Sequence, residues 1–374
     1  MTRNILASLT FFCCFTMNAA AQKLMVGSFT FKDGSVYTGD ITNGKPNGQG
    51  RTQFANGDTY EGTYNKGKRQ GQGVMIFADG EKYEGTWFND QQHGKGTYYF
   101  INNNRYEGLW YRDYREGKGV MYYYNGDIYS GDWKSDKRNG EGTYTYVSGA
   151  YYKGHWVDDK KQGKGVFDWH DGSKYEGQWN NNLRNGYGIF YYADGDVYTG
   201  DWKDDNQHGK GIYKFRNGDV YEGQYQAGQR TGEGVFTFAN GNKYSGTFVE
   251  GEQSGQGTFY WKGSASYTGQ WQHNKPHGQG VYKTKAGDEY NGQWAGGLME
   301  GEGILRTANG DKYKGKFKQG LKHGKCIEIM ADGTRFEGSY NEGERDGNFS
   351  EYDKNGNKIA SGKYVNGRRE EKKK

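Results

Sequence analysis

The sequence predicts an all-β fold, an elongated, twisted antiparallel meander of about fourteen β-hairpin repeats of 23 residues in a single layer. Three observations support this prediction. A tyrosine recurs every 23 residues without any insertion or deletion, glycine follows each tyrosine two positions later, and tight-turn dipeptides recur with the same period. The recurring tyrosines are Tyr37, Tyr60, Tyr83, Tyr106, Tyr129, Tyr152, Tyr175, Tyr198, Tyr221, Tyr244, Tyr267, Tyr290 and Tyr313, and the next step reaches Phe336.

Composition separates this chain from disordered proteins and from nucleic-acid binders. Only 32% of residues are hydrophobic and the mean hydropathy is −1.13, values that in isolation are typical of disorder. Aromatic residues nevertheless reach 17% and recur in register, as thin ordered layers require. The net charge is +5, with basic and acidic residues mixed along the length, whereas nucleic-acid binders concentrate basic residues on one stripe.

Residues 1–21 have the pattern of a secretory signal peptide. Arg3 gives a short positive region, an apolar stretch from Ile5 to Met17 follows, and small residues end at Ala21. We expect cleavage after Ala21 and a secreted, periplasmic or cell-envelope location; an uncleaved anchor is the alternative. Two of the three cysteines leave with this segment, so Cys326 has no partner for an intramolecular disulfide. It stands where other repeats have glycine, which favours a packing role over a reactive thiol.

Residues 22–36 are predicted to form a capping strand before the array. The segment Ser28–Phe31 reads as a strand, and Asp33-Gly34 supplies its turn. Atypical first and last repeats are expected in an array, because each terminal unit has a neighbour on one side only.

The repeat array is predicted to span residues 37–358, and the unit that starts at Tyr83 illustrates it. Tyr83, Gly85 and Trp87 alternate with polar residues on one strand. We expect a polar turn over 89–93 and a second strand over 94–100, with Gly94 and Gly96 on one face. The structural anchors of the unit are therefore Tyr83, Gly85, Trp87, Gly94 and Gly96.

The glycines of each unit indicate how so thin a layer is stabilised. Aromatic rings that lie over strand glycines are a known stabilising device in sheets. An aromatic residue four positions after most anchor tyrosines supports this interpretation. Residues 359–374 are interpreted as a degenerate last unit followed by a solvated basic tail.

The unit Tyr175-Glu176-Gly177-Gln178-Trp179, followed by Gly186-Tyr187-Gly188, resembles the MORN (membrane occupation and recognition nexus) repeat. The resemblance covers about residues 37–358. It implies an array of hairpins that acts as a scaffold or contact surface, with phospholipid binding proposed for some members. Some members adjoin lipid-kinase domains, but this chain has neither the room nor a Gly-rich loop with a following catalytic lysine.

The sequence offers no catalytic constellation, no metal site and no cofactor site. Four histidines, His93, His208, His277 and His323, share one polar position of the repeat, which separates them too widely to converge on zinc. Glutamates that follow the anchor tyrosines recur at identical spacing, which favours a solvated charged face because a catalytic site is singular. The Gly-x-Gly pairs have no helix after them and do not match a phosphate loop.

The sequence therefore predicts a non-catalytic scaffold or binding protein with no small-molecule substrate and no nucleic-acid partner. Its partner is expected to be a protein or a second copy of the chain, with membrane phospholipid as another possibility. The alternative is a carbohydrate or cell-wall binder that stacks sugars on regularly spaced aromatic rings, and it requires free tryptophan faces. The candidate surface or lipid contacts are Lys82, Arg105, Lys174, Lys312, Trp110 and Trp133.

Overall fold

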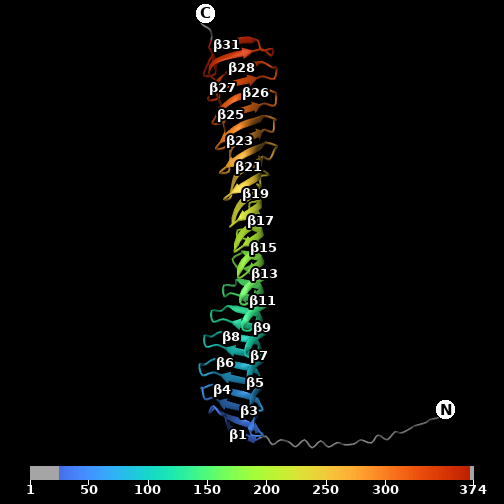
Figure 1. Cartoon of the computed structure of the whole chain (residues 1–374), viewed down its shortest axis with the longest axis vertical. Coiled ribbons are helices and arrows are strands. Elements are labelled where there is room, and N and C mark those ends of the chain that lie inside the picture. The colour runs from blue at the N-terminus through green and yellow to red at the C-terminus, as the bar shows by residue number, and fades with distance from the viewer. Residues whose placement is uncertain (1–24, 371–374) are drawn as a thin grey trace, which may run out of the picture. The chain divides into compact units, whose positions relative to one another are not determined.

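The computed structural model describes residues 25–370, which form strands and turns and contain no helix (Figure 1). The predicted signal peptide, residues 1–21, lies outside the described residues. The chain divides at residues 137 and 138 into two units, which we describe one at a time. In each unit consecutive strands pair antiparallel in chain order, so the predicted all-β meander of hairpins is confirmed.

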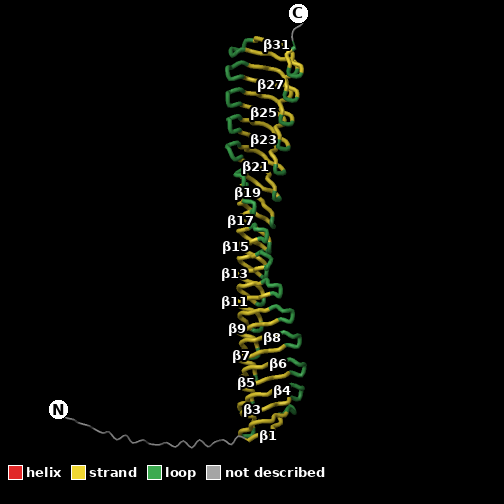
Figure 2. The backbone as a smooth tube through the Cα atoms, turned by 180° about the vertical axis from the view of Figure 1, so that it is seen from behind, coloured by secondary structure: helices red, strands yellow, loops and turns green. Residues whose placement is uncertain are grey.

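The first unit contains ten strands, joined by turns at both ends of the strands (Figure 2). They are β1 (Met25–Thr30), β2 (Val36–Thr42), β3 (Lys45–Gln53), β4 (Thr59–Asn65), β5 (Lys68–Ile76), β6 (Lys82–Phe88), β7 (Gln91–Tyr99), β8 (Arg105–Tyr111), β9 (Tyr114–Tyr122) and β10 (Ile128–Lys134). The predicted capping strand corresponds to β1, which pairs with β2.

The second unit repeats the same alternation of seven-residue and nine-residue strands until its last repeat, where the strands shorten. Its strands are β11 (Lys137–Thr145), β12 (Tyr151–Val157), β13 (Lys160–Asp168), β14 (Lys174–Asn180), β15 (Leu183–Tyr191), β16 (Val197–Lys203), β17 (Asn206–Lys214), β18 (Val220–Gln226), β19 (Gln229–Thr237), β20 (Lys243–Val249), β21 (Glu252–Tyr260), β22 (Ser266–Gln272), β23 (Lys275–Lys283), β24 (Glu289–Ala295), β25 (Leu298–Arg306), β26 (Lys312–Lys318), β27 (Leu321–Ile329), β28 (Arg335–Asn341), β29 (Glu344–Arg345), β30 (Gly347–Tyr352), β31 (Lys358–Val365) and β32 (Arg368–Arg369). Part of the predicted solvated tail is therefore a strand, because β32 pairs with β31.

The turn inside each hairpin is shorter than the sequence predicted. A five-residue turn was expected over 89–93, but only Asn89 and Asp90 separate β6 from β7, with φ of 50° and 72°. Two successive residues in the left-handed region are typical of a two-residue type I′ turn, which Asn and Asp tolerate. Residues 91–93 consequently belong to the second strand.

The second strand of the hairpin is longer than the first, and a β-bulge accommodates its additional residues. In the hairpin of β6 and β7, Gly85 pairs with Gly96 and Trp87 with Gln92, so two additional residues lie on β7. Gly94 has a φ of 61°, and glycine occupies this left-handed conformation without steric cost. The predicted Gly-x-Gly signature thus serves two purposes, because its first glycine forms the bulge and its second faces the partner strand.

The aromatic side chains form the core on one face of the sheet. Tyr83 is fully buried, and its ring lies across Gly85 and Gly96, where a Cβ at Gly85 would come within 2.6 Å of the tyrosine oxygen. The hydroxyl of Tyr83 donates a hydrogen bond to the Thr86 carbonyl at 2.9 Å. This arrangement recurs in the repeats of both units and explains why the sheet needs glycine at these positions.

Candidate binding surfaces

The tryptophans predicted to be exposed belong to the core. Trp110 is 6% exposed and Trp133 is 4% exposed, so the prediction that they contact lipid is wrong. Most anchor tyrosines lie edge to face against the aromatic residue of their own repeat and of the next one, as Tyr106 does with Trp110 and Trp133 at 5.3 Å. Such T-shaped pairs are a favoured aromatic geometry. The carbohydrate alternative required free tryptophan faces, and these rings are covered by their neighbours.

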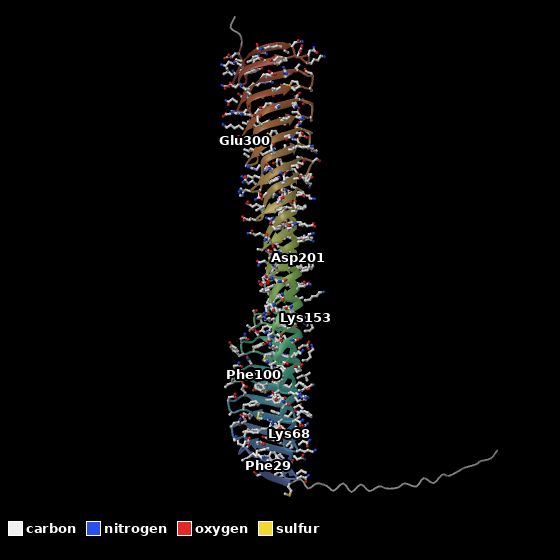
Figure 3. The ribbon with its side chains drawn as sticks, viewed as in Figure 1. Phe29, Lys68, Phe100, Lys153, Asp201 and Glu300 are labelled. Carbon is white, nitrogen blue, oxygen red and sulfur yellow. The ribbon has the colours of Figure 1, made fainter. Side chains whose placement is uncertain are left out.

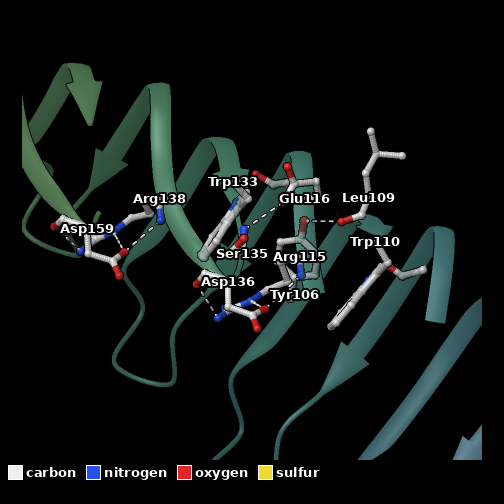
Figure 4. A network of polar contacts seen from close by, with 12 residues as sticks. Tyr106, Leu109, Trp110, Arg115, Glu116, Trp133, Ser135, Asp136, Arg138 and Asp159 are labelled. Carbon is white, nitrogen blue, oxygen red and sulfur yellow. Dashed lines mark hydrogen bonds and ion pairs between the residues drawn. The ribbon is translucent and has the colours of Figure 1, made fainter. Parts of the chain in front are cut away.

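On the solvent side of the core, basic side chains lie over several of the tryptophan rings. The guanidinium of Arg115 lies 4.5 Å from the Trp133 ring centroid, and its Nε donates to Asp136 Oδ1 at 2.9 Å (Figure 4). In the second unit Arg138 lies 4.3 Å from Trp156 and pairs with Asp159 in the same way. Cation–π contact and a charge-assisted hydrogen bond act together at each repeat that has both residues.

Three of the four basic residues predicted to contact a surface already have anionic partners. Lys82 pairs with Glu84 at 2.9 Å, Arg105 with Glu107 at 3.0 Å and Lys174 with Glu176 at 2.5 Å. Each cation also lies over a tyrosine of the neighbouring strand, as Arg105 does over Tyr122 at 4.3 Å. The hydrogen bond that Lys82 Nζ donates to Glu84 Oε2 is the leading cause that raises the pKa of Lys82. These side chains are therefore locally neutralised.

Lys312 differs from the other three candidates. It is half-buried at the start of β26, opposite Arg306 and Ile329 on the adjacent strands. Among the described residues no carboxylate lies within ion-pair distance of its amine. The four predicted contacts thus differ in whether a carboxylate compensates their charge.

Sequence reasoning missed a solvent-exposed aromatic patch in the first unit. We define the aromatic patch as Phe88, His93, Tyr111, Arg112 and Tyr114. Phe88 and Tyr111 are each 49% exposed and Tyr114 is 55% exposed. The His93 ring lies between those of Phe88 and Tyr111, at 5.5 and 5.3 Å, and its buried Nδ1 has no hydrogen-bond partner.

The strand register brings the patch together. Tyr111 and Tyr114 face each other across the two-residue turn between β8 and β9. The guanidinium of Arg112, within that turn, lies 5.2 Å from the Tyr111 ring. The sequence did carry a signal, since Phe88, Tyr111 and Tyr114 are aromatic at positions where several other repeats have Lys, Asn or Gln. The prediction of a five-residue turn concealed that these positions share one face.

The opposite face of the sheet carries shallow polar cavities. In the first unit a cavity of about 640 Å³ is lined by Arg51, Glu61, Gln72 and Glu84. In the second unit a cavity of about 680 Å³ is lined by Lys314, Lys325, Glu302 and Glu337. Both mix basic and acidic side chains, which fits a solvated face better than a site for a ligand of one charge.

The chemistry available in the described part of the chain is limited. Within residues 25–370 no three His, Cys, Asp or Glu side chains converge as metal ligands, and no helix is long and apolar enough to cross a membrane. Burial raises the pKa of the Cys326 thiol to about 11, so the thiol stays protonated at neutral pH. Figure 3 shows side chains projecting from both faces of the sheet along each unit.

Comparison with protein families gives a consistent result. The model of the MORN repeat matches thirteen consecutive segments. They are residues 37–59, 60–82, 83–105, 106–128, 129–151, 152–174, 175–197, 198–220, 221–243, 244–264, 267–289, 290–312 and 313–335. No curated protein sequence matches the chain.

Solved structures give only weak likenesses. The TCP domain of SAS-4 (dCPAP) from Drosophila melanogaster, in complex with a proline-rich motif of Ana2 (dSTIL), is 15% identical with a TM-score of 0.27, over 41% of this chain and 85% of that one. The TCP10 domain of Danio rerio CPAP, in complex with a STIL peptide, is 11% identical with a TM-score of 0.25, over 76% and 96%. Virginiamycin B lyase from Staphylococcus aureus is 12% identical with a TM-score of 0.13, over 82% and 91%. Such scores carry no argument about this chain.

Proposed function

Because this chain belongs to the MORN-repeat family, whose model matches it from residue 37 to residue 335, we propose that it is a non-catalytic scaffold that docks a protein partner outside the cytoplasm. The observation that carries the proposal is the aromatic patch of the first unit. It is the place where large aromatic side chains of neighbouring strands gather in solvent, while the recurring tyrosines and tryptophans are buried.

The composition of the patch fits a protein interface. Tyrosine, phenylalanine and arginine are enriched in the energetically dominant part of protein interfaces. A neighbouring set of exposed aromatic rings also offers more apolar surface than singly scattered residues do.

A membrane partner has weaker support. Anionic headgroups attract clusters of uncompensated basic residues. Lys82, Arg105 and Lys174 are instead each paired with a glutamate two residues later. We therefore favour a protein partner over a phospholipid surface.

Location outside the cytoplasm rests on the sequence. The positive residue, apolar stretch and small residues up to Ala21 have the order of a secretory signal. After cleavage Cys326 is the one remaining cysteine, so export imposes no disulfide pairing on the chain.

Photo-crosslinking from the aromatic patch tests this function. p-Benzoylphenylalanine replaces Tyr114 in one variant and Tyr260, which is 51% exposed in the second unit, in a control variant. We expect a discrete crosslinked protein from position 114 and none from position 260. The captured protein is then produced pure, and its affinity is measured for the wild type and for the Tyr111→Ala/Tyr114→Ala double variant.

The outcomes separate the alternatives. Loss of affinity in the double variant but not in Tyr260→Ala supports docking at the aromatic patch. A crosslink between two copies of this chain would replace the partner with self-association. Equal crosslinking from both positions, or affinity unchanged in the double variant, would overturn the proposal.

A further inference from the structure

The row of cations that covers the tryptophans has a gap in the second unit. The basic residue lies nine positions after the anchor tyrosine, as Arg184 and Arg230 do. In the next three repeats this position holds Gln253, Pro276 and Met299. Three neutral side chains therefore follow one another at a position where several earlier repeats place an arginine or lysine over the aromatic core, and where Gln92 and Gln207 are single interruptions.

A cavity opens at the start of this gap. It has a volume of about 470 Å³ and is lined by Phe236, Phe248, Phe259, Trp261, Trp271 and Arg230, among others. Phe248 occupies the position of the tryptophan in other repeats and fills less space. Trp261 is 37% exposed at this cavity, so part of its aromatic lining is open to solvent.

Within residues 25–370 the guanidinium of Arg230 has no counter-ion. Two repeats earlier, Arg184 Nε donates to Asp205 Oδ1 at 3.0 Å, and its guanidinium lies 4.4 Å from Trp202. The residue equivalent to Asp205 in the Arg230 repeat is Gly251, whose carbonyl accepts one bond from Arg230 Nη2 at 2.9 Å. Among the described residues no carboxylate lies within ion-pair distance of Arg230.

From this geometry we propose that the cavity binds a small aromatic carboxylate. The rings of the ligand lie against Phe236, Phe259 and Trp261, which keep part of their surface in solvent, and its carboxylate pairs with Arg230 in place of the absent aspartate. Charge-assisted bonds from arginine to a carboxylate are among the stronger hydrogen bonds in proteins, and they favour this planar partner. The volume lies within the range of sites for small ligands.

The lining disfavours other ligand classes. A cation would be repelled by Arg230, and a sugar needs several polar groups around it. Asn274 Oδ1 already accepts the backbone N–H of Gln253 at 2.8 Å, so this oxygen is engaged within the fold. This site lies in the second unit, and the inference is independent of the protein partner proposed for the first unit.

A matched pair of fluorescent probes tests the proposal on the full mature chain. Anilinonaphthalene sulfonate carries an anionic group on an aromatic body, and phenylnaphthylamine has the same rings without the charge. We expect the sulfonate to bind, naphthoate to displace it, and naphthalenemethanol to compete poorly. The sulfonate should bind about tenfold or more tightly than the neutral probe, as expected for one charge-assisted bond in a partly buried site.

Gly251→Asp is the decisive variant, because it supplies Arg230 with an internal counter-ion. Gly251 has a φ of 84°, and Asp90, Asp136 and Asp205 occupy the equivalent turn position at φ between 66° and 72°, so the change fits the backbone. We expect this variant to unfold no earlier than the wild type and to lose the preference for the anionic probe. Arg230→Gln should also lose the preference for the anionic probe, whereas Arg184→Gln should keep this preference.

Three results would overturn the proposal. They are equal affinity for the charged and neutral probes, undiminished binding in Gly251→Asp, or an equal loss in Arg184→Gln. The last result would place the probe elsewhere along the arginine row.

Discussion

At the scale of single residues, a cation that lies over a tryptophan is paired or unpaired according to the residue that faces it from the next hairpin. Arg115, Arg138 and Arg184 each meet an aspartate 21 positions later. Lys161 meets Asn182, whose Oδ1 accepts its backbone N–H at 2.8 Å, and its amine lies among Tyr152, Phe167 and Trp179. Burial among these rings lowers the pKa of Lys161 to about 8. Folding therefore penalises the charged form of this lysine.

Asn182→Asp is expected to stabilise the second unit at pH 7. An aspartate keeps the backbone bond and adds a negative charge beside the Lys161 amine, which we expect to be worth about 0.5–1 kcal/mol in the free energy of unfolding, allowing for partial solvent screening. Because the lysine pKa is lower in the folded state, the unfolded chain binds more protons between about pH 8 and pH 10. Wild-type stability should rise with pH in this window, and it should rise less in the variant.

Urea unfolding of both proteins at pH 7 and pH 9.5 measures these differences. Asn274→Asp is the matched control, since Asn274 accepts the same backbone bond from Gln253, whose side chain carries no charge. If both substitutions change the free energy of unfolding equally, the change arises from an aspartate in the turn and not from its charge beside Lys161.

At the scale of secondary-structure elements, the two strands of a hairpin are held together by a tyrosine ring that packs over a glycine on each strand. A Cβ added at Gly188 would lie within 3.0 Å of the Tyr175 ring, which is held edge to face by Trp179 and Trp202. Gly188→Ala should therefore displace the ring and destabilise the surrounding strands by about 1–3 kcal/mol, as overpacking in a core does.

Hydrogen exchange locates this damage within the molecule. Because repeats in an array interact mainly with their neighbours, amides of β14, β15 and β16 should lose protection while those of β24 and β25 keep it. A uniform loss of protection across the second unit would show that the glycine contact is not a local constraint.

Periodicity alone predicted the hairpins, the buried face and the glycine contacts. It could not predict the two-residue turn, because the strand length depends on the bulge at Gly94 and therefore on a left-handed φ. It also placed Trp110 on the correct face but did not show that the next repeat covers it. The pairing of Arg115 with Asp136 joins adjacent hairpins, so alternation within one strand gives no sign of it. The aromatic patch and the cavity beside Arg230 both lie where residues depart from the repeat pattern, so the periodicity did not predict them.

The last hairpins of the second unit replace an aromatic contact with a buried ionic network. Glu328 is 5% exposed and accepts bonds from Lys322 Nζ at 2.6 Å, Arg345 Nη2 at 2.6 Å and the Tyr340 hydroxyl at 2.9 Å. Burial alone would raise the pKa of Glu328, but the bonds from Lys322 and Arg345 outweigh it and lower the pKa. The network therefore stabilises the fold at neutral pH and loses this effect as Glu328 becomes protonated in acid.

Glu328→Gln is expected to loosen β27, β28 and β30. It leaves two cations without a buried counter-charge, which should cost about 2–4 kcal/mol once their partial exposure is allowed for. Amide exchange at neutral pH should show this loss in the variant, and acid should add less further loss than in the wild type. Glu337→Gln is the control, because Glu337 pairs with Arg335 on the exposed face. An equal effect of both substitutions would contradict a special role for the network.

At the scale of the whole molecule, a net charge of +5 does not translate into a basic surface. The 50 basic and 45 acidic residues are interspersed, and many cations have a carboxylate within reach. Long-range attraction to anionic surfaces depends on uncompensated charge, and it weakens as salt screens it. The distribution of ion pairs, and not the total charge, should therefore decide whether the chain binds membranes.

Co-sedimentation of residues 22–374 with vesicles tests this argument. We expect no salt-sensitive binding to vesicles of phosphatidylglycerol beyond that to phosphatidylcholine, because Lys82, Arg105 and Lys174 are each neutralised by a neighbouring glutamate. The triple variant with glutamine at positions 84, 107 and 176 removes those carboxylates without adding bulk. It frees three cations at about 1 kcal/mol each near an anionic surface, so it should bind at low salt and release at high salt. Binding of the wild type as strong as that of the variant would mean that the paired cations remain available to lipid, and the choice of a protein partner would lose its electrostatic support.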